Sequence, residues 1–145
     1  MTREALQEIA ERYVQVWQRR DPPEIARFHA SDGVAESPIY ATLRGRKAIE
    51  DAWRAFFTSF PDATMTTDAV LVDAPRIAIF TTVSATHVNE FFGMPGTNRH
   101  VEFRNARLME TDETGLIKHE RRIYDFTGLL VQVGILRAKP AKPRG

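Results

Sequence analysis

The sequence predicts an α+β domain in which three N-terminal helices precede a bent antiparallel sheet. Up to Phe60, apolar residues recur at three- and four-residue spacings, which is typical of amphipathic helices. From Thr64 onward, long runs rich in β-branched and aromatic residues are separated by turn-like segments, which is typical of strands. The 145 residues suit one domain, because two units of half this length would each have a thin core.

Three segments are expected to be helical. The first lies within residues 1–21, and the second begins at Pro22-Pro23, since proline is tolerated in the first turn of a helix. The second helix is expected to end near residues 31–33. The third spans roughly Arg46–Phe60 and ends there because Pro61 cannot continue it. Their apolar faces are formed by Leu6, Ile9, Ala10, Tyr13, Val14 and Trp17, by Ile25 and Phe28, and by Ile49, Ala52, Trp53, Phe56, Phe57 and Phe60.

Four segments are expected to be strands. Residues 73–75 and 112–115 have the composition of short turns, whereas residues 89–99 contain glycine and proline and form a longer loop. Strands of about a dozen residues are longer than the usual five or six, so the sheet is expected to bend. The strand segments are Val70–Val72, Arg76–Val88, His100–Thr111 and Leu116–Phe126.

Composition excludes several classes of function. Lys and Arg number 20 and Asp and Glu 19, so the formal charge of +1 does not favour nucleic acid or a membrane as a partner. The chain has no cysteine, its four histidines lack metal-ligand spacing, and it contains no glycine-rich phosphate loop. We therefore expect a cytoplasmic protein without metal or cofactor, and a basic flexible tail at residues 137–145.

Several short motifs follow one another along residues 5–136: Gly45–Ile49, Phe60–Asp62, Thr86-His87, Phe92-Gly93, Val101–Phe103, Gly115–Ile117, Tyr124-Asp125 and Leu129–Gly134. No single motif is specific, but the ordered set resembles the SnoaL-like polyketide cyclases of the nuclear transport factor 2-like superfamily. This resemblance implies a nuclear transport factor 2-like cone, with the three helices packed on a strongly curved antiparallel sheet around a ligand cavity. It also implies one domain at residues 1–136, a homodimer and a small hydrophobic ligand.

The resemblance further implies that Asp125 is catalytic, because such cyclases place a general acid/base aspartate ten residues after the hairpin glycine, here Gly115. The strand at residues 101–111 lacks the histidine that characterised cyclases also use, so the acid/base pair is incomplete. A structural ion pair between Asp125 and Arg107, Arg121 or Arg122 is the alternative, since such networks also perturb carboxylates.

The register of the last hairpin decides where Asp125 points. A three-residue loop with a left-handed glycine sets Phe103 opposite Asp125 and Asn105 opposite Ile123 on one face. A two-residue loop shifts the register by one and moves Asp125 to the other face. The alternate residues within 101–109 include the more apolar set and are taken as the interior, so the first register places Asp125 in the cavity. Burial there raises a carboxyl pKa toward neutrality, as a general acid/base requires.

Three functions remain open. The first is acid–base chemistry of the cyclase or isomerase kind on a hydrophobic, carbonyl-bearing molecule, with Asp125 as the catalyst. The second is a non-catalytic ligand-binding or dimerisation module, because one fold serves many functions. The third is an epoxide hydrolase that combines a cavity aspartate with Arg107 and either Glu102 or Glu110. The expected substrate-binding residues are Tyr13, Trp17, His87, Phe103, Asn105, Arg107 and Ile123.

Overall fold

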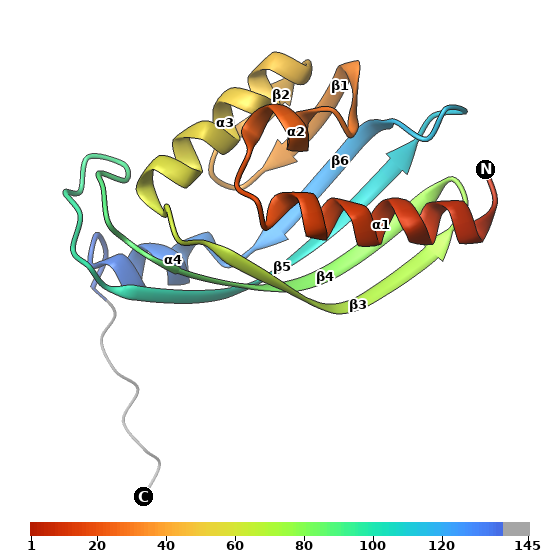
Figure 1. Cartoon of the computed structure of the whole chain (residues 1–145). Helices are drawn as coiled ribbons and strands as arrows, with labels where there is room; N and C mark the ends of the chain where they lie inside the picture. Colours follow the sequence, from red (N-terminus) through yellow and green to blue (C-terminus); the bar gives the residue numbers. More distant parts are fainter. Residues whose placement is uncertain (138–145) are drawn as a thin grey trace, which may run out of the picture.

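A computed structural model describes residues 1–137 and confirms the α+β class, with helices packed on one curled sheet (Figure 1). The sheet has six strands in the order β2-β1-β6-β5-β4-β3. Helices α1 to α3 cover one face of the sheet, and the core lies between these two layers. The elements are α1 (Arg3–Trp17), α2 (Pro22–Ala26), β1 (His29–Ser37), β2 (Ala41–Arg44), α3 (Arg46–Ser59), β3 (Thr64–Asp73), β4 (Arg76–Thr86), β5 (His100–Thr111), β6 (Ile117–Tyr124) and α4 (Phe126–Val133).

Helix α1 begins and packs as its sequence predicts. The Thr2 side chain accepts a hydrogen bond from the backbone N–H of Ala5 at 3.1 Å, which caps the helix. The predicted apolar stripe of α1 is buried except for Val14, which lies partly exposed against the core. Tyr13 and Trp17, at the end of this stripe, therefore face the sheet from the helix layer.

The prediction for the second helix is wrong at its end, because α2 stops at Ala26 and residues 31–33 belong to strand β1. Strand β1 runs parallel to β6, and the Ile117 N–H donates to the Phe28 carbonyl at 2.8 Å where the two meet. The sheet is therefore mixed, whereas the sequence predicted an antiparallel one. Polar residues dominate β1 and β2, so neither strand carried a local signal.

A short fourth helix follows β6, which ends at Tyr124 instead of continuing to Phe126. Helix α4 packs where β5 extends beyond the end of β6. There the Gln132 amide takes the place of a neighbouring strand, accepting from the Glu102 N–H at 2.8 Å and donating to the Glu102 carbonyl at 2.9 Å. This pairing fixes α4 against the edge of β5.

The last hairpin has the predicted three-residue loop, yet the predicted register is wrong beyond it. The Asp112 N–H donates to the Leu116 carbonyl at 2.8 Å, but a β-bulge then shifts the pairing between Glu110 and Thr111. Asn105 consequently lies opposite Tyr124 and not opposite Ile123. Because a one-residue shift reverses the faces, the side chains of β6 that reach the interior are the other alternate set.

None of the helices in residues 1–137 is long and apolar enough to cross a membrane. The predicted basic tail at residues 137–145 lies outside the described residues except for Arg137.

Candidate active site

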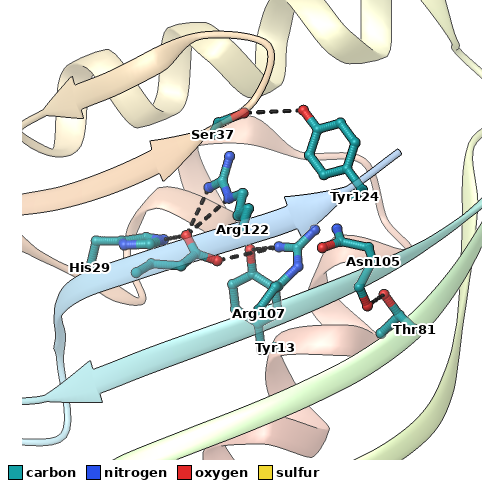
Figure 2. Close-up of polar contacts among 9 residues, drawn as sticks. Tyr13, His29, Ser37, Thr81, Asn105, Arg107, Arg122 and Tyr124 are labelled. Atoms are coloured by element: carbon teal, nitrogen blue, oxygen red, sulfur yellow. Dashed lines mark hydrogen bonds and ion pairs between the residues drawn. The ribbon is translucent and has the colours of Figure 1, made fainter. Parts of the chain in front are cut away.

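Strands β5 and β6 bring a group of charged side chains into the interior, among them Arg107 and Arg122 (Figure 2). The buried carboxylate of Glu120 forms ion pairs with both arginines. Arg122 donates to one carboxylate oxygen of Glu120 at 3.1 Å from Nε and at 2.9 Å from Nη2. Arg107 Nη1 lies 3.6 Å from the other oxygen and donates to the Tyr13 hydroxyl at 2.5 Å. His29 Nε2 lies 3.9 Å from Glu120. All five side chains are at most 5% exposed.

This buried cluster carries an excess positive charge. Burial lowers the pKa of His29 to about 4 and raises the pKa of Tyr13 to about 12, so both are neutral at pH 7. Burial also acts to raise the pKa of Glu120, but Arg122, His29 and Arg107 outweigh it and lower that pKa to about 2. Two guanidinium groups thus share one carboxylate, leaving one unbalanced positive charge within the cluster.

A pocket between α3 and the inner face of the sheet lies directly beside this cluster. Its walls include Trp17, Trp53 and Phe103, and both Arg107 and Arg122 contribute to its lining. Its volume is about 20 Å³, which is close to the space that one water molecule needs. Side chains therefore fill most of the cone interior in this conformation.

Four residues of the pocket lining each carry a buried polar atom that has no hydrogen-bond partner within the described residues. These atoms are Trp17 Nε1, Trp53 Nε1, Arg107 Nε and Asn105 Oδ1, which are three donors and one acceptor. Buried polar groups in proteins are nearly always hydrogen-bonded, and leaving one unpaired costs stability. Four such atoms around one pocket are typical of a site that binds a polar part of a ligand.

Aromatic rings and hydroxyls complete the lining. The guanidinium carbons of Arg107 and Arg122 lie 5.1 and 4.4 Å from the ring centre of Trp53, so this indole partly offsets their charge. The hydroxyl of Tyr124 lies 3.1 Å from that of Ser37, which fixes the phenol at the pocket wall (Figure 2). The site therefore offers planar apolar walls and hydrogen-bonding groups concentrated near β5 and β6.

The structure brings together most of the expected substrate-binding residues. The pocket is lined by Trp17, Phe103, Asn105 and Arg107. Tyr13 is not part of the lining, but its hydroxyl accepts a hydrogen bond from Arg107. His87 does not contribute, because it is buried between Phe60 and Phe91, with Nδ1 3.0 Å from the Thr97 hydroxyl.

The expectation that Asp125 and Ile123 face the cavity is wrong. Ile123 is 63% exposed on the outer face of the sheet, as the β-bulge requires. Asp125 is exposed and accepts a hydrogen bond from the Gly128 N–H at 2.8 Å, which caps helix α4. The structure thus gives the Asp125 carboxylate a capping role, and the pairing expected with Phe103 does not form.

Sequence reasoning missed Glu120, Arg122, Tyr124 and Ser37. The first three alternate along β6. A prediction that shifted the register of the last hairpin by one residue would therefore have placed their side chains in the interior. Ser37 lies on β1, which had no strand signal. For the epoxide hydrolase alternative, Glu102 and Glu110 lie on the opposite face of β5 from Arg107, so the expected set is not assembled.

Comparisons with known proteins agree on the family and the fold. The model of the SnoaL-like polyketide cyclases matches residues 7–133. Among curated proteins, none matches this chain.

Three solved structures with similar folds share 18–22% of their sequence with this chain. AclR from Streptomyces galilaeus, a suggested hydroxylase, has a TM-score of 0.84 and 22% identity, covering 96% of this chain and 87% of its own. IdmH from Streptomyces antibioticus, a suggested polyketide cyclase, has a TM-score of 0.76 and 22% identity, with coverage of 89% and 98%. A Catenulispora acidiphila protein with a ketosteroid isomerase-like fold has a TM-score of 0.73 and 18% identity, with coverage of 88% and 92%. The expected nuclear transport factor 2-like cone is thereby confirmed.

Proposed function

Because the chain belongs to the SnoaL-like polyketide cyclase family, we propose that it is a cyclase-type enzyme that acts on a hydrophobic, carbonyl-bearing molecule without a cofactor. Its site is the pocket between α3 and the sheet. The four unpartnered polar atoms of the pocket-lining residues carry this proposal, since a carbonyl-bearing ligand satisfies donors that the protein leaves unpaired. The tryptophan walls favour a planar apolar body.

The charge excess supports a specific role for the arginines. Cyclisation by an aldol reaction removes a proton from a carbon next to carbonyl groups, and the resulting enolate carries negative charge on oxygen. Arg107 and Arg122 present guanidinium groups to the pocket, and Glu120 balances only one of them. A fixed positive charge in a site that excludes bulk water stabilises such an oxyanion without reorganisation. In this proposal a single water molecule, for which the pocket has room, takes the proton from the carbon. The enolate carbon then bonds to the carbon of the second carbonyl, whose oxygen accepts a hydrogen bond from the Tyr124 hydroxyl. The alkoxide formed there takes the proton back from the protonated water, so that the closed ring carries a hydroxyl group.

A general acid/base role for Asp125, which the family resemblance implies, stays a prediction. Its carboxylate is engaged with the Gly128 N–H and does not line the pocket. Such a role therefore requires that the start of α4 rearrange when a ligand binds.

The proposed function is tested with two small probes of the pocket. Wild-type protein is expected to bind 2-naphthol and lower its pKa, because the excess positive charge favours the naphtholate. It is also expected to accelerate exchange of the α-protons of 2-tetralone in D2O, followed by NMR. Trp53→Phe, which removes one unpartnered donor, should weaken both effects, whereas Arg76→Met, at an arginine paired with Asp73 on the surface, should change neither.

The same experiment separates the alternatives. Binding of 2-naphthol without proton exchange on 2-tetralone identifies a non-catalytic ligand-binding module. Failure of the wild-type protein to bind or ionise 2-naphthol refutes the proposed oxyanion site.

We also propose that a second copy of this chain covers the outer face of the sheet. Ala69, Phe80, Ala106 and Ile123 form an apolar row across four paired strands, and Phe80 and Ile123 are 42% and 63% exposed. Asp68 and Arg104 line the same groove. In a two-fold dimer each of these opposite charges can therefore face its counterpart on the other copy.

The dimer is tested by light scattering after size-exclusion chromatography. Wild-type protein is expected to be dimeric and Ile123→Glu monomeric, with the control Lys47→Glu still dimeric. A monomeric wild-type protein at high concentration refutes this proposal.

A further inference from the structure

The pocket is too small for an organic ligand unless one of its walls moves. Its volume of about 20 Å³ compares with several hundred Å³ in ordinary ligand sites. Most of the wall residues are buried side chains on α1, α3 and the strands, which are held on all sides by the core. Ser37 and Tyr124 restrain each other through their hydroxyls. Only Ile39 and Tyr40 reach the pocket from a turn, the one that joins β1 to β2.

Tyr40 also lines a groove on the surface. This groove has a volume of about 360 Å³ and lies between α3 and the loop that joins β4 to β5, so Tyr40 is shared by the pocket and the groove. Ala55 and the rings of Phe91 and Phe92 line the same groove, and the Phe92 ring lies 6.3 Å from that of Tyr40. The Tyr40 hydroxyl makes no hydrogen bond within the described residues, so side-chain rotation breaks none.

We propose that Tyr40 is the movable wall of the pocket and that the outer groove is the second half of the binding site. This inference rests on the proposed function. When the Tyr40 ring rotates toward solvent, the pocket and the groove become one continuous cleft. The carbonyl end of the ligand then reaches Asn105 and Arg107, and its distal part lies against Phe91 and Phe92.

The lining of the groove defines the class of ligand. Phe91 and Phe92 are 3% and 53% exposed, and their rings meet at 87° with centres 4.8 Å apart, which gives an aromatic surface at the groove. The one carboxylate there, Glu90, accepts a hydrogen bond from the Gly93 N–H. The groove thus suits an uncharged aromatic or alkyl group, and the whole cleft suits an elongated molecule with its oxygen functions at one end.

The role of Tyr40 as a wall of the pocket is tested without any ligand. The two tryptophans of the chain, Trp17 and Trp53, both line the pocket, so their fluorescence reports on its access to solvent. Tyr40→Ala is expected to raise the acrylamide quenching constant by about twofold or more, whereas Tyr40→Phe keeps the wall and the wild-type value. Quenching of Tyr40→Ala at the wild-type value would overturn the role of Tyr40.

The outer half of the site is tested with two ligands of different length, 2-naphthol and 6-phenyl-2-naphthol, by calorimetry. Ala55→Phe fills the groove at an exposed position of α3 that does not touch the inner pocket. It is expected to weaken binding of 6-phenyl-2-naphthol about tenfold or more and to leave 2-naphthol unchanged. Asp51→Phe, exposed on the same helix outside the groove, is the control and should affect neither.

The outcomes distinguish this inference from the proposed function. Equal effects of Ala55→Phe on the two naphthols, or no effect on either, overturn the outer half of the site while the proposed function stands. If the wild-type protein binds neither naphthol, the proposed function fails and the outer half of the site fails with it. The quenching experiment still decides the role of Tyr40 in that case.

Discussion

Replacing Asn105 by valine should stabilise the protein and impair its site. Asn105 is 5% exposed and its Oδ1 has no hydrogen-bond partner among the described residues. An unpaired buried polar atom costs about 1–3 kcal/mol, and valine removes that atom while suiting a central strand. We expect the free energy of unfolding to rise by about 1 kcal/mol, and the melting temperature by about 4 °C for a chain of this size. Binding of 2-naphthol and exchange on 2-tetralone should both decrease.

The matched control is Thr111→Val, also on β5. Thr111 is 2% exposed, but its hydroxyl donates to the Pro75 carbonyl at 2.9 Å. Its replacement should therefore lower the free energy of unfolding by about 1 kcal/mol, the opposite sign. Both variants are compared with wild type by urea unfolding and by thermal melting. A loss of stability in Asn105→Val equal to that in Thr111→Val would refute the reasoning, because it would show that Asn105 is fully hydrogen-bonded.

Three further predictions concern titratable residues. Burial lowers the pKa of His29 to about 4, whereas the unfolded chain has a histidine pKa near 6.5, so on acidification the unfolded state takes up the proton first. The free energy of unfolding is therefore complete above pH 6.5 and falls by about 3 kcal/mol as the pH is lowered toward 4. Urea unfolding of His29→Gln should lack this dependence of stability on pH. Glu120→Gln leaves two buried guanidinium groups without a carboxylate and should lower the free energy of unfolding by about 3–5 kcal/mol, whereas Glu50→Gln, at a surface pair, should cost under about 1 kcal/mol. Asp125→Ala removes the cap of α4 and should lower the free energy of unfolding by about 1 kcal/mol. Asp125→Asn keeps a capping oxygen, so it should keep both the stability and the proton exchange on 2-tetralone. Loss of exchange in the asparagine variant alone would show that the carboxylate takes part in catalysis.

Local patterns identified helices α1 and α3, the start of α2 and the interior face of β5 correctly. The alternation from Val101 to Met109 placed Asn105 and Arg107 inside, because successive side chains of a strand point to opposite faces. Helix α4 was missed because its apolar run is short, and runs of this length do not distinguish a strand from a helix. The cap formed by Asp125 was a local signal for this helix that the reading as a strand overlooked.

The candidate site depended on information that local patterns lack. The hairpin loop was predicted correctly, but the bulge beyond it exchanged the faces of β6. This one-residue change removed Asp125 and Ile123 from the interior and put Glu120 and Arg122 there. A bulge depends on how two strands fit the whole curved sheet, so the turn sequence alone does not specify it.

By itself, the sequence determined the α+β class, the family and the inward-facing residues of β5, because periodicity and motif order are properties of neighbouring residues. Only the tertiary structure decided which charges meet. The parallel pairing of β1 with β6 brings Ser37 to Tyr124 across 87 residues of chain, and the same pairing places His29 beside Glu120. Tyr40 likewise lines both the pocket and the groove only because the turn after β1 lies close to α3 and Phe92. Such contacts depend on the closure of the cone, which no local segment encodes.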